Sequence, residues 1–122
     1  MSRSDLDGIP WRPTRYEGVA VHFYAADRAR GRVLALIRMA PGCGYPRHRH
    51  HGIEEVRVLR GGYADERGGY EAGSFVRYEA GSAHAPCALP GNEACVLLAL
   101  AHEGIGLLAP GDDPTGEPGA RP

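Results

Sequence analysis

Residues 41 to 54 read Pro-Gly-Cys-Gly-Tyr-Pro-Arg-His-Arg-His-His-Gly-Ile-Glu, and they hold the densest group of chemically active side chains in the chain. His48 and His50 alternate, so an extended strand would place both imidazoles on one face, roughly 7 Å apart along the chain. Glu54 would lie about 13 Å further along a straight strand, which is too far to share one ion. Gly52 permits a turn, because glycine tolerates a positive φ. A second strand after that turn would bring Glu54 back beside the histidines.

Two imidazoles and a carboxylate suit one divalent transition-metal ion (Fe, Zn, Mn, Ni or Cu) far better than Mg or Ca. The alternative is a histidine-rich strand and turn on the surface, since two histidines at this spacing often occur by chance. The added Glu54, the flanking glycines at 42 and 61, and a distant Gly-x-x-His ending at His84 favour a metal site.

The alternation within residues 54 to 60 supports the same hypothesis. Glu54 shares one face of the expected strand with Val56 and Val58. A lone carboxylate on an apolar face is costly without a positively charged partner, and a metal ion would supply that partner.

Length and composition restrict the possible function classes. A chain of 122 residues suits one domain with a single core. The net charge of −1 does not suggest binding to nucleic acid or to an anionic membrane. The longest apolar run, 94–101, is too short to cross a bilayer. All fourteen basic residues are arginine, which excludes lysine chemistry. Three cysteines without CxxC spacing, and no signal peptide before them, favour a reduced, cytoplasmic setting.

The apolar pattern predicts only strands. We expect them at 18–24, 32–40, 54–60, 63–65, 70–72, 74–78, from residue 84, and at 94–102. Glycine-containing turns separate them, and no segment has a helical period of convincing length. Short strands with frequent turns are typical of an antiparallel sandwich or barrel. Residues 1–12 are predicted to be an extended arm anchored only by Trp11, and residues 110–122, rich in Pro and Gly, a disordered tail.

Two motifs in this chain resemble those of the cupins. The first motif is met at every spacing: Gly42, five residues, His48-x-His50, three residues, Glu54, six residues, Gly61. The second is met in part: Gly73, five residues, Glu79-Ala-Gly81, two residues, His84. Glu79 stands where the family usually has Pro, and Ala88 where it often has Asn.

The resemblance implies a small antiparallel double-sheet jelly roll, a single cupin barrel, over residues 13–109. It also implies four metal ligands: His48, His50, Glu54 and His84. A closer likeness, to the cupin domain of ChrR-type anti-sigma factors, covers about residues 33–101. It rests on Tyr-Pro-Arg-His-Arg-His at 45–50, on the pair Glu54-Glu55, and on the run 61–77.

Four protein ligands leave one or two coordination positions open, as small-molecule chemistry at a metal requires. The chain is also similar to acetylacetone-cleaving and dihydroxyacetophenone dioxygenases. This implies a metal-dependent, Fe(II)-type oxygenase acting on a small chelating ketone or enol. The acetylacetone type has three histidine ligands, so the additional ligand Glu54 weakens the case for the same activity in this chain. Tyr63 and Arg77 are the candidate catalytic residues; the alternatives are a core tyrosine and a surface arginine.

The alternative function is a non-catalytic, ChrR-like metal or ligand sensor. ChrR-type proteins carry an N-terminal zinc domain that grips a sigma factor, and an arm of twelve residues is not expected to replace it. The expected partners are a small-molecule ligand or substrate and a second copy of the chain. Pairing exposed sheet edges across a two-fold axis would satisfy their backbone groups, with the arm around Trp11 crossing over.

Overall fold

The structure is a computed structural model, and it describes residues 6–27, 29–103 and 105–107. Every named element within them is a strand. In chain order the strands are β1 (Arg12–Pro13), β2 (Val19–Asp27), β3 (Arg32–Met39), β4 (His48–His50), β5 (Glu54–Arg60), β6 (Gly62–Asp65), β7 (Gly68–Glu71), β8 (Phe75–Tyr78), β9 (Ala83–His84), β10 (Cys87–Ala88), β11 (Cys95–His102) and β12 (Ile105–Leu107). In the described part of the chain, no helix is long and apolar enough to cross a membrane.

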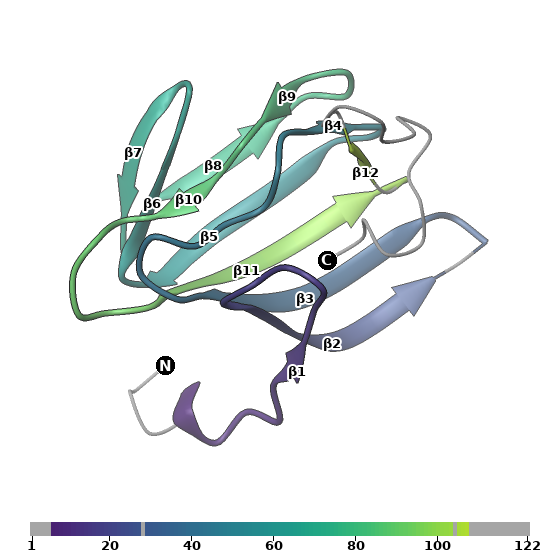
Figure 1. Cartoon of the computed structure of the whole chain (residues 1–122). Helices are drawn as coiled ribbons and strands as arrows, with labels where there is room; N and C mark the ends of the chain where they lie inside the picture. Colours follow the sequence, from purple (N-terminus) through teal and green to yellow (C-terminus); the bar gives the residue numbers. More distant parts are fainter. Residues whose placement is uncertain (1–5, 28, 104, 108–122) are drawn as a thin grey trace.

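The strands form one large sheet and two small ones. The large sheet has the order β1-β2-β3-β11-β5-β8, and the small sheets have the orders β10-β6-β7 and β12-β4-β9. Figure 1 shows the large sheet curving from β2 through β11 to β8, with β4, β6, β9 and β10 closing over one of its faces. All pairings are antiparallel, which confirms the predicted double-sheet jelly roll.

The main difference in strand boundaries concerns β2. The sequence predicts that this strand ends at residue 24, but it continues to Asp27. A register shift between Phe23 and Ala25 lets residues 25–27 stay paired with the start of β3. Pairing with β3 therefore overrides the weak strand preference of Ala25 and Ala26.

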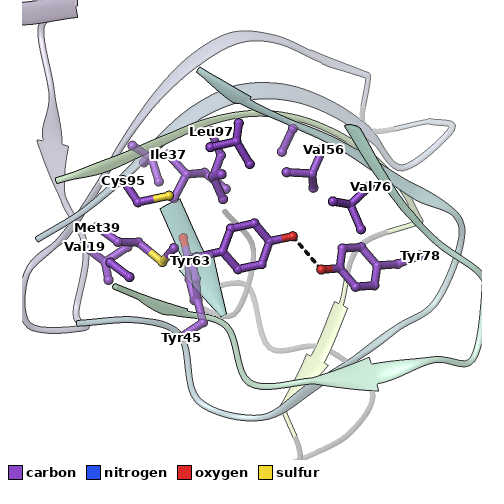
Figure 2. Packing of buried hydrophobic residues seen from close by; sticks show 14 residues of the cluster. Val19, Ile37, Met39, Tyr45, Val56, Tyr63, Val76, Tyr78, Cys95 and Leu97 are labelled. Carbon is purple, nitrogen blue, oxygen red and sulfur yellow. Dashed lines mark hydrogen bonds between the residues drawn. The ribbon is translucent and has the colours of Figure 1, made fainter. Parts of the chain in front are cut away.

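The main core lies between the layers and is built largely from β3, β5, β8 and β11. Its buried members are Val19, Val21, Ile37, Met39, Tyr45, Val56, Val58, Tyr63, Val76, Tyr78, Ala88, Cys95, Leu97 and Ala99. Figure 2 shows the hydroxyl groups of Tyr63 and Tyr78 pointing toward each other, with aliphatic and sulfur-containing side chains around the tyrosine rings. A tyrosine-rich core brings hydroxyl groups inside, and each of them needs a hydrogen-bond partner.

A second, smaller cluster covers the other face of the large sheet. Leu6, Leu36 and Val96 are each at most 3 % exposed there, and Trp11 packs against them only partly buried. The prediction that the indole alone anchors the arm is therefore wrong, since Leu6 is the most buried residue of the described segment 6–12. The indole instead donates a hydrogen bond to the Leu6 carbonyl, at 3.3 Å. The predicted tail, 110–122, lies outside the described residues.

Candidate metal centre

The four side chains implied by the cupin resemblance come together at one end of the barrel. His48 and His50 lie on β4, Glu54 begins β5, and His84 ends β9. Strands β4 and β9 pair so that His48 lies directly opposite His84. One ligand atom from each of the four residues lies within 4.8 Å of the others, and all four residues are buried. The pairing of β4 with β9 therefore brings His84 to the other three ligands, although it lies thirty residues after Glu54.

The turn that returns Glu54 to the histidines needs glycine, but for a different reason from the one the sequence suggests. Gly52 does not have a positive φ. A Cβ atom at this position would instead lie 2.5 Å from the carbonyl oxygen of His102. The backbone of His102 also donates to the carbonyl of Ile53 at 3.0 Å, which holds the two segments together. Close approach of two backbone segments, rather than turn conformation, explains Gly52.

Hydrogen bonds at Nδ1 fix the orientation of two of the imidazoles. His48 Nδ1 lies 3.1 Å from the carbonyl oxygen of Pro46, which can only accept. His84 Nδ1 lies 2.8 Å from Oδ2 of Asp65. Hydrogen bonds to Tyr78 and His84 outweigh burial and hold the pKa of Asp65 below its usual value, so its carboxylate also accepts. Both rings therefore carry their proton on Nδ1 and leave Nε2 free to bind a metal.

The third imidazole is fixed in the same way. His50 Nδ1 lies 3.2 Å from the hydroxyl oxygen of Ser82. That hydroxyl donates its own proton to the carbonyl of Glu79, at 2.6 Å. It can therefore only accept from His50, and Nε2 of this ring is again the atom without a proton.

Two of these Nε2 atoms, in His50 and His84, are buried and have no hydrogen-bond partner among the described residues. His50 Nε2 also faces Oε1 of Glu54 at 3.0 Å. When Nδ1 carries the proton, both facing atoms are acceptors, so a positive charge is needed near them. Leaving such groups unpaired costs about 1–3 kcal/mol each. A transition-metal ion held by these residues fits this donor set.

The electrostatics of the cluster favour the ligand form of each group. Burial and the neighbouring His84 lower the pKa of His48 to about 4. Burial also lowers the pKa of His84. Burial would raise the pKa of Glu54, but the contact with His50 outweighs burial and holds the pKa below its usual value. At neutral pH His48 and His84 are neutral imidazoles and Glu54 is an ionised carboxylate, which are the forms that bind a metal.

Sequence reasoning missed Asp65, whose side chain is fully buried beside His84. Besides His84, its Oδ2 accepts a hydrogen bond from the Tyr78 hydroxyl at 2.7 Å. Tyr63 in turn donates to the Tyr78 hydroxyl at 2.5 Å, the contact drawn as a dashed line in Figure 2. The available signal was strand alternation, since Asp65 lies on the same face of β6 as the core residue Tyr63. The chain Tyr63–Tyr78–Asp65–His84 thus connects the core to a metal-ligand candidate.

The structure separates the two candidate catalytic residues. Tyr63 is buried and lines the cavity beside the four-residue cluster. Arg77 lies on the outer face of β8, where its side chain is 51 % exposed and pairs with Glu79 at 3.3 Å. Its neighbours Val76 and Tyr78 take the inward positions of this strand. The structure therefore brings Tyr63 to the site and does not bring Arg77.

A cavity of about 30 Å³ adjoins the cluster. It is lined by Ile37, Met39, Tyr45, His48, Glu54, Val56, Tyr63, His84, Pro86, Leu97 and Ala99. A volume of this size holds roughly one or two water molecules. The space next to the candidate metal position is therefore small, partly open and mainly apolar.

Solved structures of other proteins share this fold. An RmlC-like cupin protein from Ralstonia eutropha JMP134 aligns with a TM-score of 0.77 and 24 % identity, over 88 % of this chain and 71 % of that one. An acetylacetone dioxygenase from Acinetobacter johnsonii aligns with a TM-score of 0.75 over 93 % of this chain and 78 % of that one. Its 12 % identity carries information about the fold alone.

The similarity to ChrR extends to the sequence. A chain in the crystal structure of Rhodobacter sphaeroides SigE in complex with the anti-sigma ChrR aligns with a TM-score of 0.69 and 28 % identity. The alignment covers 79 % of this chain but only 50 % of that one, so this chain spans about half its length. None of the curated proteins compared with the chain matches it. The family described as the ChrR cupin-like domain matches residues 2–103, and the chain therefore belongs to this family of the cupin superfamily.

Proposed function

We propose that this cupin binds one divalent transition-metal ion through His48, His50, Glu54 and His84, and offers an open coordination position to a small ligand. The observation that carries the proposal is the shared orientation of the three imidazoles. Each is held at Nδ1, and the ligand atoms of all four residues gather within 4.8 Å. Four protein ligands on a five- or six-coordinate ion leave room for exchange.

Metal content tests this proposal. Protein purified without an affinity tag should retain, or take up on titration, one transition-metal ion per chain. The variant Glu54→Gln keeps the size of the side chain but loses its charge, and it should bind metal at least tenfold more weakly. Glu55→Gln, the adjacent residue on the opposite face of β5, is the matched control. Equal affinity in all three proteins would contradict the assignment of the site.

The activity we propose is an oxygenase-type reaction on a small chelating ketone or enol, for which Fe(II) would supply O₂ activation. The small, mainly apolar cavity supports it, because fixed dipoles and charges act more strongly on developing charge where little water is present. The fold similarity to an acetylacetone dioxygenase agrees with it. Tyr63 is retained as the candidate catalytic residue because it lines the cavity. Arg77 has no part in the proposal, since its side chain points away.

Oxygen uptake tests the reaction. After anaerobic Fe(II) loading, a panel of β-diketones and hydroxyketones should produce absorption bands that decay when O₂ is admitted. Stoichiometric O₂ consumption should accompany the decay, and the Glu54→Gln variant should show neither. Tight binding without turnover for every compound would refute an oxygenase and leave the regulatory function.

Membership of the ChrR cupin-like family favours this second candidate, a non-catalytic metal or ligand sensor. In that case the metal centre would bind a ligand, and a partner protein would distinguish the ligand-bound form. The solved ChrR structure is a complex with a sigma factor, so a SigE-class sigma factor is the first partner to test. Partner binding that differs between the ligand-bound and ligand-free forms of the metal-loaded protein would support the sensor.

Two further expectations stay proposals. Phe75 is 63 % exposed on β8, which is an edge strand of the large sheet, and this supports a homodimer. Light scattering that gives a single-chain mass at micromolar concentration would count against it. Cys43, Cys87 and Cys95 are free thiols, which supports the reduced, cytoplasmic setting.

A further inference from the structure

One hydroxyl group in the core has no hydrogen-bond partner in the part of the chain that the structure describes. Tyr45 is only 7 % exposed, and its hydroxyl is one of three buried side-chain N or O atoms without a partner among the described residues. The other two are Nε2 of His50 and Nε2 of His84. Buried polar atoms in folded proteins are nearly always paired, so each exception needs an explanation. A metal ion explains the two imidazoles, but it does not explain the hydroxyl.

The unpaired hydroxyl belongs to the same cavity as the candidate metal ligands. Tyr45 lines that cavity together with His48, Glu54 and His84. Its ring centroid lies 6.1 Å from that of His48, and Figure 2 shows its hydroxyl pointing inward among the core side chains. Burial, and then the negative charge of Glu54, raise the pKa of the Tyr45 hydroxyl. It therefore keeps its proton and can act only as a neutral donor or acceptor.

The other tyrosines of the core differ in this respect. The Tyr63 hydroxyl also belongs to a cavity-lining residue, but it donates to Tyr78, which donates to Asp65. Those hydroxyls are occupied within the protein. Among the tyrosines that line the cavity, Tyr45 alone keeps a hydroxyl for a molecule that enters it.

We propose that Tyr45 is the residue that recognises the exogenous ligand, by donating a hydrogen bond to the acceptor atom of the ligand at the open position of the metal. The inference rests on the proposed metal site and adds the chemical class of the ligand. The coordinating end of the ligand carries an oxygen or an anionic nitrogen as acceptor. It is only a few atoms in size, because the cavity measures about 30 Å³.

A larger substrate can still satisfy these limits. Tyr45 and Pro86 line both the inner cavity and a shallow hollow on the surface, which also includes Arg15 and Tyr16. The two residues thus form the wall between the cavity and solvent. A substrate with a small oxygen-bearing head would place that head beside Tyr45 and its remainder toward the hollow.

Azide binding to the Co(II)-loaded protein tests the inference, because azide is a small anionic acceptor and its binding changes the visible spectrum of Co(II). Tyr45→Phe removes the hydroxyl and keeps the ring. It should weaken azide binding roughly 10- to 100-fold, the value of one hydrogen bond to a charged group. The control is Tyr16→Phe. In the parent protein the Tyr16 hydroxyl accepts from the Arg15 side chain, and its ring packs on that of Tyr45 with the centroids 5.3 Å apart. Tyr16 does not line the cavity. The control variant should bind azide like the parent protein.

Azide affinity within twofold of the parent value in Tyr45→Phe would overturn the inference and leave the metal site intact. Failure of the parent protein to bind Co(II) through Glu54 would overturn both proposals. The metal-free proteins give a second readout. Because the substitution removes an unpaired buried hydroxyl, Tyr45→Phe should melt at or above the parent temperature. A clear loss of stability would mean that the hydroxyl has a structural partner, which would also refute the proposal.

Discussion

Replacing Asp65 with Asn is the sharpest test of how the protein prepares its metal site. The parent carboxylate is fully buried and accepts from both sides. Oδ2 accepts from His84 and Tyr78, at 2.8 and 2.7 Å, and Oδ1 accepts from the backbone N–H of Arg67 at 2.9 Å. Asparagine has the same shape, but one of its two terminal groups is a donor. No orientation of the amide satisfies all of these contacts.

The cost follows from the two possible orientations. If the amide oxygen takes the place of Oδ2, the NH₂ group faces the backbone N–H of Arg67. If the amide is flipped, the NH₂ group faces His84, whose proton must then move from Nδ1 to Nε2, the atom that would bind the metal. Each orientation loses at least one hydrogen bond to a charged group, worth about 1.5–3 kcal/mol of unfolding free energy. Loss of such a support for a ligand typically weakens metal binding 10- to 100-fold.

Two measurements separate these effects. Competition with a chromophoric chelator gives the Co(II) or Zn(II) dissociation constant, and urea unfolding of the metal-free protein gives stability. Asp65→Asn should raise the dissociation constant and lower the stability, whereas Asp27→Asn should change neither. Asp27 is 41 % exposed and, among the residues that the structure describes, pairs only with Arg30 in a surface turn. A parent-like metal affinity in Asp65→Asn would refute the view that Asp65 fixes the protonation state of His84.

Three further outcomes are expected. His50→Ala should abolish stoichiometric metal binding and remove the stabilisation by metal, about 4 kcal/mol at a thousand times the dissociation constant; unchanged metal content, or an equal loss in His22→Ala, would contradict this. Because burial lowers the pKa of His48 from 6.5 to about 4, the unfolded chain takes up a proton in this range and the folded chain does not. Metal-free stability should therefore be complete above pH 6.5 and fall by roughly 3 kcal/mol towards pH 4, and a flat urea-unfolding profile would disprove it. Gly52→Ala should lower the free energy of unfolding by about 1–3 kcal/mol, because the new Cβ would lie 2.5 Å from a backbone carbonyl oxygen. Gly69→Ala, which has open space around it, should leave the thermal unfolding temperature nearly unchanged.

Strand alternation accounts for most of what the sequence could predict at the site. It correctly turned Glu54 towards the core with Val56. Applied to β8, it would also have turned Arg77 outward, opposite to Val76 and Tyr78, and so removed it from the catalytic candidates. Applied to β6, it would have turned Asp65 inward. The period of two thus gives the face on which each of these side chains lies in the structure.

Other features depend on contacts that no local pattern contains. His50 is oriented by Ser82, thirty-two residues away, and His84 by Asp65, nineteen residues away. Leu6 is buried only because the outer face of the large sheet leaves Leu36 and Val96 to be covered. Motif spacing predicts which side chains could be ligands. It does not predict which of their nitrogen atoms face the metal, since that is set by tertiary hydrogen bonds.

The same hydrogen bonds bear on the choice between an enzyme and a sensor. A sensor needs two states of the protein that its signal binds with different affinity. Here the protein itself fixes all three imidazoles through Nδ1, so metal binding has little left to order in β4 and β9. A conformational signal from metal loading alone is therefore disfavoured. The group free to respond is Tyr45, whose hydroxyl is unpaired and whose ring separates the cavity from the surface hollow. If this protein regulates a partner, the signal should follow the small ligand at the metal, and Tyr45→Phe should weaken the partner's response to that ligand while leaving its response to metal unchanged.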